Sequence, residues 1–215
     1  MRQLETYLVT DRGLCGARGV EAVVREAVAG GATIVQLRDP HAHTAQLVED
    51  ARALLRVLRP AGVPLIVNDR VDVALAAGAD GVHVGQSDMS PADARALLGP
   101  GRILGLSISS LAELERAAEV LELVDYLGVG PIFATHTKPD AASPMGVEGL
   151  AAVVARSLLP VVAIGGLHAG NAAQAVRAGA AGVAVVSAIC AAADPRAATR
   201  ELAHVVHAAR SGELR

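Results

Sequence analysis

One helix, a glycine turn and a buried strand follow one another in Val71-Asp72-Val73-Ala74-Leu75-Ala76-Ala77-Gly78-Ala79-Asp80-Gly81-Val82-His83-Val84. The pattern predicts a helix over residues 71–76 and a strand over residues 81–84. A glycine just past a helix can adopt the left-handed conformation that closes the last turn. Similar joints, Ala29-Gly30-Gly31-Ala32 and Ala178-Gly179-Ala180-Ala181, precede two other predicted strands. The chain is therefore expected to repeat a helix–strand unit.

The predicted strands are short, almost continuously apolar and rich in β-branched residues, which is typical of strands covered on both faces. They span residues 4–10, 33–37, 64–67, 81–84, 102–106, 126–129, 161–164 and 182–186. Helical segments are predicted over residues 20–29, 44–58, 71–76, 91–98, 111–121, 147–156, 172–178 and 195–209. Strands that alternate with helices in this way run parallel.

Two architectures accommodate such strands: a closed eight-stranded barrel and an open, doubly wound sheet. Eight units fit into 215 residues, which is near the lower end of the range for barrels. The Gly-x-Gly-x-x-Gly of dinucleotide-binding open sheets does not follow the first predicted strand. We therefore predict an α/β protein with the (β/α)8 TIM-barrel fold, a single domain over residues 1–215 in which residues 210–215 form a frayed tail.

The composition excludes several other classes of protein. Hydrophobic residues make up 52% of the chain and charged residues 19%, so a large core is available and disorder is excluded. The net charge is −3, and the aromatic residues are two tyrosines and one phenylalanine. Nucleic-acid binding is therefore not expected, because both a basic stripe and a stacking surface are missing.

No apolar run reaches the ~18 residues of a membrane helix, and the polar opening Met1-Arg2-Gln3-Leu4-Glu5 predicts no signal peptide. We expect a cytoplasmic protein without a membrane partner. Cys15 and Cys190 are then expected to be reduced, buried thiols. A homo-oligomer is left open.

Polar residues collect at the carboxyl ends of the predicted strands, where barrels of this type carry their chemistry. In chain order they are Gln36-Leu37-Arg38-Asp39, Asn68-Asp69-Arg70, Gly85-Gln86-Ser87-Asp88, Ser107, Thr135-His136-Thr137-Lys138, Gly165-Gly166 and Val186-Ser187. The opposite strand ends carry mainly Gly, Ala and Pro. This asymmetry predicts one functional face.

Asp69 and Asp88 follow neighbouring strands, so their carboxylates are expected to converge on one hard cation. Two such oxygen ligands, with waters and a phosphate-bearing substrate, suit Mg²⁺. The alternative for each aspartate is a helix N-cap. His41 and His43 are interpreted as solvated loop residues rather than zinc ligands.

Two further segments are suited to phosphate. The N–H groups of Gly166 and Ser187 can approach an anion closely, although Gly165-Gly166 can also be only a tight turn. Residues 131–146 form a loop of about sixteen residues, and connections of that length usually serve binding. Thr135, Thr137 and Lys138 supply donors there, with a merely solvated loop as the alternative.

Several of these motifs, in this order and spacing, resemble the thiamine phosphate synthase family from about Tyr7 to Asp194. They are Gln36-Leu37-Arg38-Asp39, Val67-Asn68-Asp69, the run from Ala79 to Asp88, Gly128-Val129-Gly130-Pro131-Ile132-Phe133, Thr135-His136-Thr137-Lys138 and Ile164-Gly165-Gly166. The resemblance implies a transferase that joins 4-amino-2-methyl-5-(diphosphooxymethyl)pyrimidine to 4-methyl-5-(2-phosphooxyethyl)thiazole. The products are thiamine monophosphate and diphosphate.

The resemblance also implies roles for individual residues. Asp69 and Asp88 match the ligands of one Mg²⁺ ion per subunit. Catalytic roles fall to Arg38, Ser107 and Lys138. The substrates are then bound by Gln36, Leu37, Arg38, Asp39, Pro40, Asn68, Ser107, Thr135, His136, Thr137, Lys138, Gly166, Val186 and Ser187.

Pro40 departs from the family pattern, which usually has a diphosphate-contacting lysine there. His41, His43 or Arg70 are candidates to replace that contact. Two alternatives remain: a thiazole tautomerase, which needs a base but neither Mg²⁺ nor a diphosphate site, and a non-catalytic binder of a phosphate ligand. The group of Asp69, Asp88, Arg38 and Lys138 favours the synthase over both.

Overall fold

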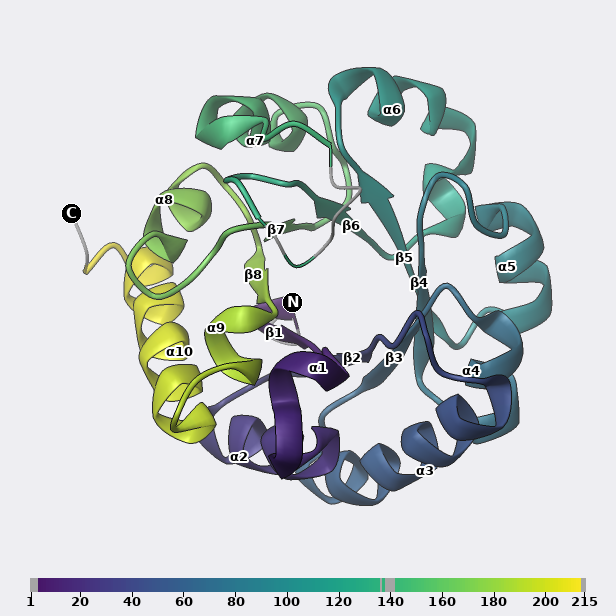
Figure 1. The fold of residues 1–215 in the computed structure, drawn as a ribbon. Coiled ribbons are helices and arrows are strands. Elements are labelled where there is room, and N and C mark those ends of the chain that lie inside the picture. The colour runs from purple at the N-terminus through teal and green to yellow at the C-terminus, as the bar shows by residue number, and fades with distance from the viewer. Residues whose placement is uncertain (1–3, 136, 138–141, 214–215) are drawn as a thin grey trace.

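A computed structural model describes residues 4–135, 137 and 142–213. Within these residues, eight parallel strands close into a barrel in sequence order, and β1 pairs with β8 (Figure 1). The strands are β1 (Thr6–Val9), β2 (Ile34–Leu37), β3 (Leu65–Asn68), β4 (Gly81–Val84), β5 (Ile103–Ile108), β6 (Tyr126–Val129), β7 (Val161–Ile164) and β8 (Gly182–Val185). The predicted barrel is confirmed, and the open sheet is excluded.

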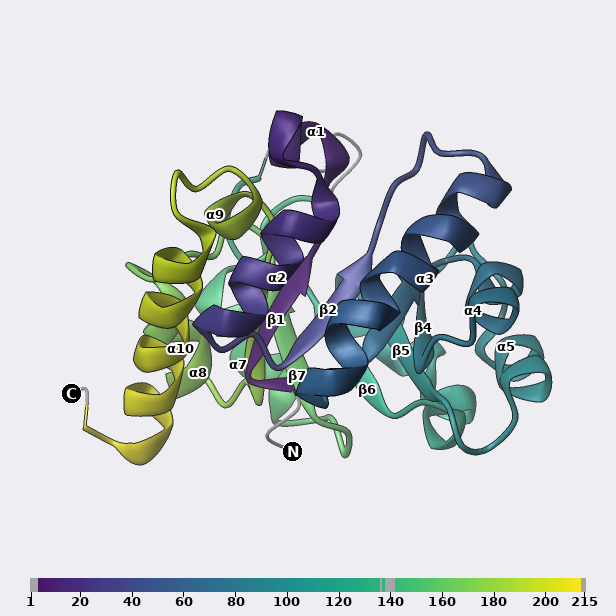
Figure 2. The same cartoon turned by 90° about the horizontal axis from the view of Figure 1, so that it is seen from below.

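Helices surround the barrel and follow each strand. They are α1 (Arg12–Cys15), η2 (Gly16–Arg18), α2 (Val20–Gly30), α3 (Thr44–Ala61), α4 (Val71–Ala77), α5 (Pro91–Leu98), α6 (Leu111–Arg116), η3 (Ala118–Leu123), α7 (Gly146–Val154), α8 (Ala172–Arg177), α9 (Ser187–Cys190) and α10 (Pro195–Ser211). Figure 2 shows α1 and α9 at the same end of the barrel. This end, where the strands have their carboxyl termini, is termed the mouth. In the described part of the chain, no helix has the length and apolar character needed to cross a membrane.

Side chains alternate along each strand between two buried regions. Those that point outward, such as Leu8, Val35 and Val82, pack against the helices in one large cluster. Those that point inward fill the barrel with a smaller cluster of Leu4, Tyr7, Val9, Ile34, Ile66, Tyr126, Val162 and Ala184. The strands are therefore mostly apolar on both faces, because both faces are covered.

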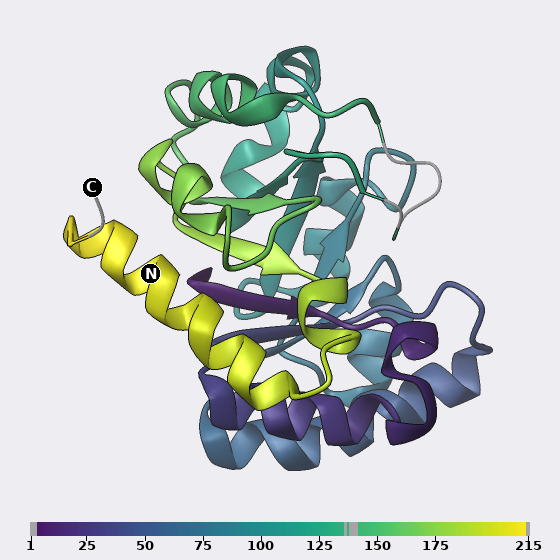
Figure 3. The same cartoon turned by 60° about the vertical axis from the view of Figure 1, so that its left-hand side comes forward.

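Helix α10 covers the seam where the last strand meets the first. It packs against α2 and α8, on the outside of the barrel (Figure 3). Its N-cap is Asp194, whose side chain accepts from the Ala197 N–H. The helix continues through Arg210 and Ser211, so the tail predicted to begin at residue 210 is wrong for these two residues. The hydrogen bond of the Arg210 side chain to Ala181 O ties this last turn to the barrel.

Other element boundaries also differ from the sequence pattern. The short helices α1 and α9 at the mouth were not predicted. The helix predicted over residues 111–121 divides into α6 and η3. A four-residue helix is too short to show a periodic apolar face, so hydrophobic patterning does not detect it. Local capping makes α1: the Asp11 side chain accepts from the Leu14 N–H at 2.9 Å.

The end of the barrel opposite the mouth is held by two aspartates. Asp80 Oδ2 accepts from the Leu65 N–H at 2.8 Å, and Asp125 Oδ2 accepts from the Leu104 N–H at 2.7 Å. Each carboxylate thus satisfies a strand N–H on the neighbouring strand. Asp125 also forms an ion pair with Arg95 at 2.8 Å.

Replacing Asp80 by alanine is expected to lower the free energy of unfolding by about 1–3 kcal/mol, because the Leu65 N–H loses its acceptor. Asp80→Asn keeps an acceptor oxygen and should lose less. Urea unfolding followed by circular dichroism measures both variants. Equal stability of Asp80→Ala and the wild type would contradict the structural role of this carboxylate.

Candidate active site

Asp69 and Asp88 are attached to the mouth ends of two paired strands. The Asp69 N–H donates to His83 O at 2.8 Å, which joins the end of β3 to β4. The Asp88 carboxylate accepts from the N–H of Gly85, the residue that follows β4, at 2.8 Å. Asn68 Nδ2 donates to Asp69 Oδ2 at 2.6 Å. The two acidic side chains therefore belong to adjacent β–α loops, as the sequence pattern predicts.

The helix-capping alternatives for these two aspartates are wrong. Helix α4 has Arg70 at its N-cap position, and α5 is capped by Ser90, whose side chain accepts from the Asp93 N–H. Asp69 instead adopts a left-handed backbone conformation with φ of 60°, the only described residue other than glycine with a positive φ. A non-glycine residue in this region is uncommon and concentrates at functional sites.

The segment after β2 divides into residues with different environments. Gln36 points into the barrel and is buried, whereas Leu37 points outward and is only 1% exposed. The side chain of Leu37 therefore does not reach the mouth, and only its main chain is available to a substrate. Leu37 therefore stays a predicted member of the binding set through its main chain alone, because alternation along the strand places its side chain in the outer core.

Asp39 is engaged by a neighbouring arginine that the sequence pattern did not single out. Arg12 Nε donates to Asp39 Oδ2 at 2.6 Å, and the same guanidinium pairs with Asp50 on α3. Partial burial opposes ionisation of Asp39, but the hydrogen bonds from Arg12 and the His41 N–H outweigh it and lower the pKa of the Asp39 carboxyl. Asp39 thus holds the loop after β2 against α1.

Arg38 presents a different arrangement from its neighbours. Its N–H donates to Thr10 Oγ1 at 3.1 Å, which fixes the main chain. Arg38 is half-buried, and its guanidinium makes no ion pair with any residue that the structure describes. By contrast, Arg70 forms an ion pair with Asp72 and donates to Thr44. Arg38 is therefore the cation after β2 that remains available to an anion.

The loops after β6 and β7 are joined at the mouth. The N–H groups of Ile132 and Phe133 donate to Ile164 O and Gly165 O, both at 3.0 Å. Gly165 and Gly166 have φ values of 101° and 63°. The Gly166 N–H donates to no described residue. Within the described residues it is therefore not engaged in the hydrogen bond of a tight turn. Thr135 lies two residues after Phe133, and its Oγ1 accepts from the Thr137 N–H at 3.4 Å.

Other predicted site residues lie around the same rim. Val186 is half-buried and directly precedes Ser187, the first residue of α9, while Pro40 is exposed. His136 and Lys138 lie outside the described residues. In the part of the chain that is described, no group of three or more His, Cys, Asp or Glu side chains is placed to hold a metal ion.

Three residues inside the barrel were not predicted as part of the site: Tyr7, His83 and Tyr126. A chain of side-chain hydrogen bonds connects them from Gln36 on β2 to Ser107 on β5. Burial raises the pKa of both tyrosine hydroxyls. The chain contains only two tyrosines, and both belong to this group, which is the one signal that could have drawn attention to it.

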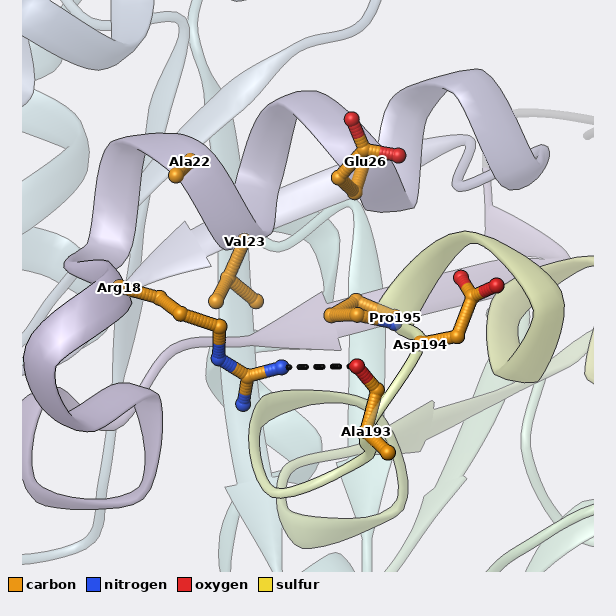
Figure 4. Close-up of a pocket in the computed structure, with 7 residues that line it drawn as sticks. All are labelled: Arg18, Ala22, Val23, Glu26, Ala193, Asp194 and Pro195. Atoms are coloured by element: carbon orange, nitrogen blue, oxygen red, sulfur yellow. Dashed lines mark hydrogen bonds between the residues drawn. The ribbon is translucent and has the colours of Figure 1, made fainter.

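A cavity of about 430 Å³ lies away from these residues, between the start of α2 and the loop before α10 (Figure 4). Its charged side chains already have partners. Arg18 donates to the carbonyls of Ala192 and Cys190, Glu26 pairs with Arg196, and Asp194 caps α10. The hollow therefore adds no available charge to the mouth.

The closed barrel and its single polar mouth define a (β/α)8-barrel enzyme. A family model described as thiamine monophosphate synthase matches residues 6–189. The chain belongs to this family, and it is a transferase.

Individual relatives agree over nearly the whole chain. A thiamine-phosphate synthase of Xanthobacter autotrophicus is 61% identical over 207 residues, which cover 96% of this chain and 97% of that protein. One of Chloroflexus aurantiacus is 56% identical over 200 residues, 93% of this chain and 91% of that protein. The solved structure of thiamine phosphate pyrophosphorylase from Pyrococcus furiosus superposes with a TM-score of 0.88 at 40% identity, covering 97% of this chain and 98% of that one.

Proposed function

We propose that this protein condenses 4-amino-2-methyl-5-(diphosphooxymethyl)pyrimidine with 4-methyl-5-(2-phosphooxyethyl)thiazole to form thiamine monophosphate and diphosphate. Family membership supports the reaction type. The observation that carries the assignment is the pair of carboxylates, Asp69 and Asp88, on adjacent loops at the same mouth as Arg38, which makes no ion pair with a described residue. A thiazole tautomerase or a phosphate-ligand binder has no need for this combination.

The pyrimidine diphosphate is assigned to the side of the mouth formed by β2 to β5. Arg38 offers its guanidinium to the diphosphate, and Lys138 is expected to do the same from the loop after β6. Gln36, Asn68 and Ser107 lie along the inner surface of this side, where the pyrimidine ring would be held. Main-chain groups of Leu37, Asp39 and Pro40 complete the binding segment.

Asp69 and Asp88 fit a magnesium ion by the chemistry of their donor atoms, because carboxylate oxygens are ligands that this hard cation prefers. The left-handed backbone of Asp69 is a local strain whose retention is explained if the carboxylate has to face a ligand. Bound Mg²⁺ would neutralise charge on the departing diphosphate.

The thiazole phosphate is assigned to the opposite side, after β6 to β8. The Gly166 N–H and the main chain of Val186 and Ser187 offer donors that can approach the phosphate closely. Thr135 and Thr137 supply hydroxyls, and His136 contributes to the same loop. Hydrogen bonds between the loops after β6 and β7 hold Gly165 and Gly166 beside the segment that leads to Thr135.

The chemistry requires charge stabilisation more than a strong base. Breakage of the carbon–oxygen bond to diphosphate leaves a pyrimidinylmethyl cation, which the ring amino group stabilises by electron donation. The thiazole nitrogen then attacks that carbon. Arg38 and Lys138 hold the leaving anion, while the fixed rim orients the two rings for attack.

Pro40 leaves the position of the usual family lysine without a charge. Arg70 is disfavoured as its replacement, because its guanidinium is already bound to Asp72 and Thr44. His41 and His43 remain the candidates. Replacing both by alanine should raise the KM for the pyrimidine diphosphate; unchanged turnover and KM would exclude them.

Arg38→Ala is expected to lower kcat/KM for the pyrimidine diphosphate about 10- to 100-fold, because a charge-assisted contact of about 1.5–3 kcal/mol is lost. The KM for the thiazole phosphate should change little. Steady-state kinetics with each substrate varied in turn measures both values. Arg38→Lys keeps the charge and should recover part of the loss, and an equal effect on both substrates would contradict the assignment.

Gly166→Ala is expected to raise the KM for the thiazole phosphate selectively. A Cβ there would lie 2.6 Å from Ala134 O, and the φ of 63° is unfavourable for alanine. The loop that carries Thr135 would have to shift. Gly62→Ala is the matched control, since Gly62 has a φ of 67° with nothing within 4 Å of its Cβ. That control should lose stability only.

One experiment tests the proposed reaction. Both substrates are mixed with the enzyme, with and without Mg²⁺, and thiamine monophosphate is detected by mass spectrometry. Product is expected only when both substrates and the metal are present. Absence of product from folded protein with Mg²⁺ would reject the proposal, and rearrangement of a thiazole phosphate without coupling would favour the tautomerase.

A further inference from the structure

A line of hydrogen bonds crosses the inside of the barrel and ends at the mouth. Gln36 Nε2 donates to Tyr7 Oη at 2.8 Å, and Tyr7 Oη lies 2.8 Å from Tyr126 Oη. Tyr126 Oη lies 2.9 Å from His83 Nδ1, and His83 Nε2 lies 2.9 Å from Ser107 Oγ. Residues from β2, β1, β6, β4 and β5 thus form one continuous chain.

The direction of this chain follows from the number of hydrogens each group carries. The Gln36 amide nitrogen can only donate, and a tyrosine hydroxyl has a single hydrogen. Tyr7 accepts from Gln36, so its hydrogen is directed to Tyr126. Tyr126 then directs its own hydrogen to His83 Nδ1. The imidazole proton therefore resides on Nε2, from which it is donated to Ser107 Oγ.

Burial keeps water from competing for these hydrogen bonds, so their donor-to-acceptor direction is maintained. Tyr7 and Tyr126 are 2% and 1% exposed, and Gln36 is 5% exposed. Both hydroxyls retain their protons at neutral pH, because burial raises the pKa of each. Each ring nitrogen of His83 lies within hydrogen-bond distance of a hydroxyl, Nδ1 of Tyr126 Oη and Nε2 of Ser107 Oγ.

The neighbouring strands leave room for the imidazole. A Cβ at Gly105 on β5 would lie within 2.5 Å of His83 Nδ1 and of two Tyr126 ring atoms. A Cβ at Gly128 on β6 would lie 2.8 Å from His83 Cε1. The rings of His83 and Tyr126 are 5.4 Å apart between centroids. Two glycines on adjacent strands thus accommodate one ring, which holds it in a single place.

The line of hydrogen bonds reaches the mouth at Ser107. It is half-buried, and Gln86 Nε2 donates to its carbonyl oxygen at 2.8 Å. Within the described residues, its hydroxyl makes no hydrogen bond besides that with His83. If Ser107 Oγ accepts from His83, the hydrogen of its hydroxyl can be donated to a group bound at the mouth.

We propose that His83 is a positioning residue: held as the Nε2–H tautomer by Tyr126, it donates to Ser107 and thereby makes the Ser107 hydroxyl a donor toward the mouth. The ligand that this donor would take is a ring nitrogen acceptor of the aminopyrimidine, and this last assignment rests on the proposed function. The opposite direction would make Ser107 an acceptor toward the mouth and would select a donor instead.

The tautomer is measured on the free, folded enzyme by long-range ¹H–¹⁵N correlation spectroscopy after ¹⁵N-histidine labelling. His83 is assigned by the loss of its signals in His83→Gln. We expect protonated Nε2 and an unprotonated, hydrogen-bonded Nδ1. Protonation at Nδ1 would overturn the proposal. This measurement needs no substrate, so it stands even if the proposed reaction were not observed.

Two phenylalanine variants test the role of Tyr126 in the tautomer. Tyr126→Phe removes the donor to Nδ1 and should shift the Nδ1 resonance of His83. Tyr7→Phe is the matched control, since Tyr126 keeps its own hydrogen for Nδ1 and the resonance pattern should be retained. Equal shifts in both variants would contradict the stated direction. Should either variant fail to fold, the wild-type spectrum still decides.

The effect on Ser107 is tested by comparing the kinetic constants of His83 variants for the two substrates. His83→Leu should lower kcat/KM for the pyrimidine diphosphate about tenfold, because one hydrogen bond to a positioned hydroxyl is lost. The KM for the thiazole phosphate should remain within about twofold. His83→Gln can place an amide N–H near the former Nε2 and should recover part of the loss. Equal losses in the leucine and glutamine variants would reject the positioning role.

Discussion

Asp69→Asn and Asp88→Asn are each expected to lower kcat by one or more orders of magnitude, with partial recovery when Mg²⁺ is raised. Each change removes one negative charge from the pair that would hold the metal against the departing diphosphate. Steady-state rates measured over a series of Mg²⁺ concentrations give both the loss and the recovery. Near-wild-type rates at limiting metal would contradict the role of the carboxylates.

Neither substitution should unfold the protein, so the loss can be attributed to chemistry. Asparagine tolerates the left-handed backbone that residue 69 adopts. An asparagine at position 88 retains an oxygen that can accept from the Gly85 N–H. Asp72→Asn is the matched control: it removes the same charge three positions from Asp69, on an exposed side chain paired with Arg70. Its kcat should stay close to that of the wild type.

Gly105→Ala is expected to lower the free energy of unfolding strongly. Its Cβ would lie within 2.5 Å of ring atoms of both Tyr126 and His83, which are buried and hydrogen-bonded on other strands. Overpacking of a filled core costs about 1–3 kcal/mol and occasionally more, and we expect the upper part of this range because neither ring can move without breaking its hydrogen bonds. Urea unfolding of the purified variant measures the loss.

Gly101→Ala is the control for this substitution. Gly101 precedes the same strand, but nothing lies within 4 Å of its added Cβ. Its free energy of unfolding should therefore stay within about 0.5 kcal/mol of the wild type. A Gly105→Ala protein as stable as the Gly101→Ala protein would show that the barrel interior is less closely packed around His83 than described.

Much of the fold could be predicted from local patterns. The bounds of β4, β6 and β7 match the predicted strands, and α5 matches its predicted helix. These elements are delimited by strong local signals, such as Pro91 at the start of α5 and the glycine joint before β4. The candidate face was also predictable, because parallel strands in a barrel bring all their carboxyl ends together.

Other features of the site could not be predicted in this way. Arg12 meets Asp39 from 27 positions away, and Tyr7 meets Tyr126 from 119 positions away. Leu37 looks like part of a polar motif but faces the outer core. Each of these outcomes depends on which side chains the closed barrel turns inward and which distant strands it places side by side.

The amino-acid order alone determined the repeating unit, the parallel direction of the strands and the rim on which the polar residues gather, because all three follow from short-range periodicity and turn chemistry. Tertiary structure alone decided the pairing of Asp39 with Arg12, the left-handed backbone at Asp69 and the internal line from Gln36 to Ser107. Closure of the barrel is the physical reason, since β1 must meet β8 before the inward-pointing side chains of different strands can contact one another.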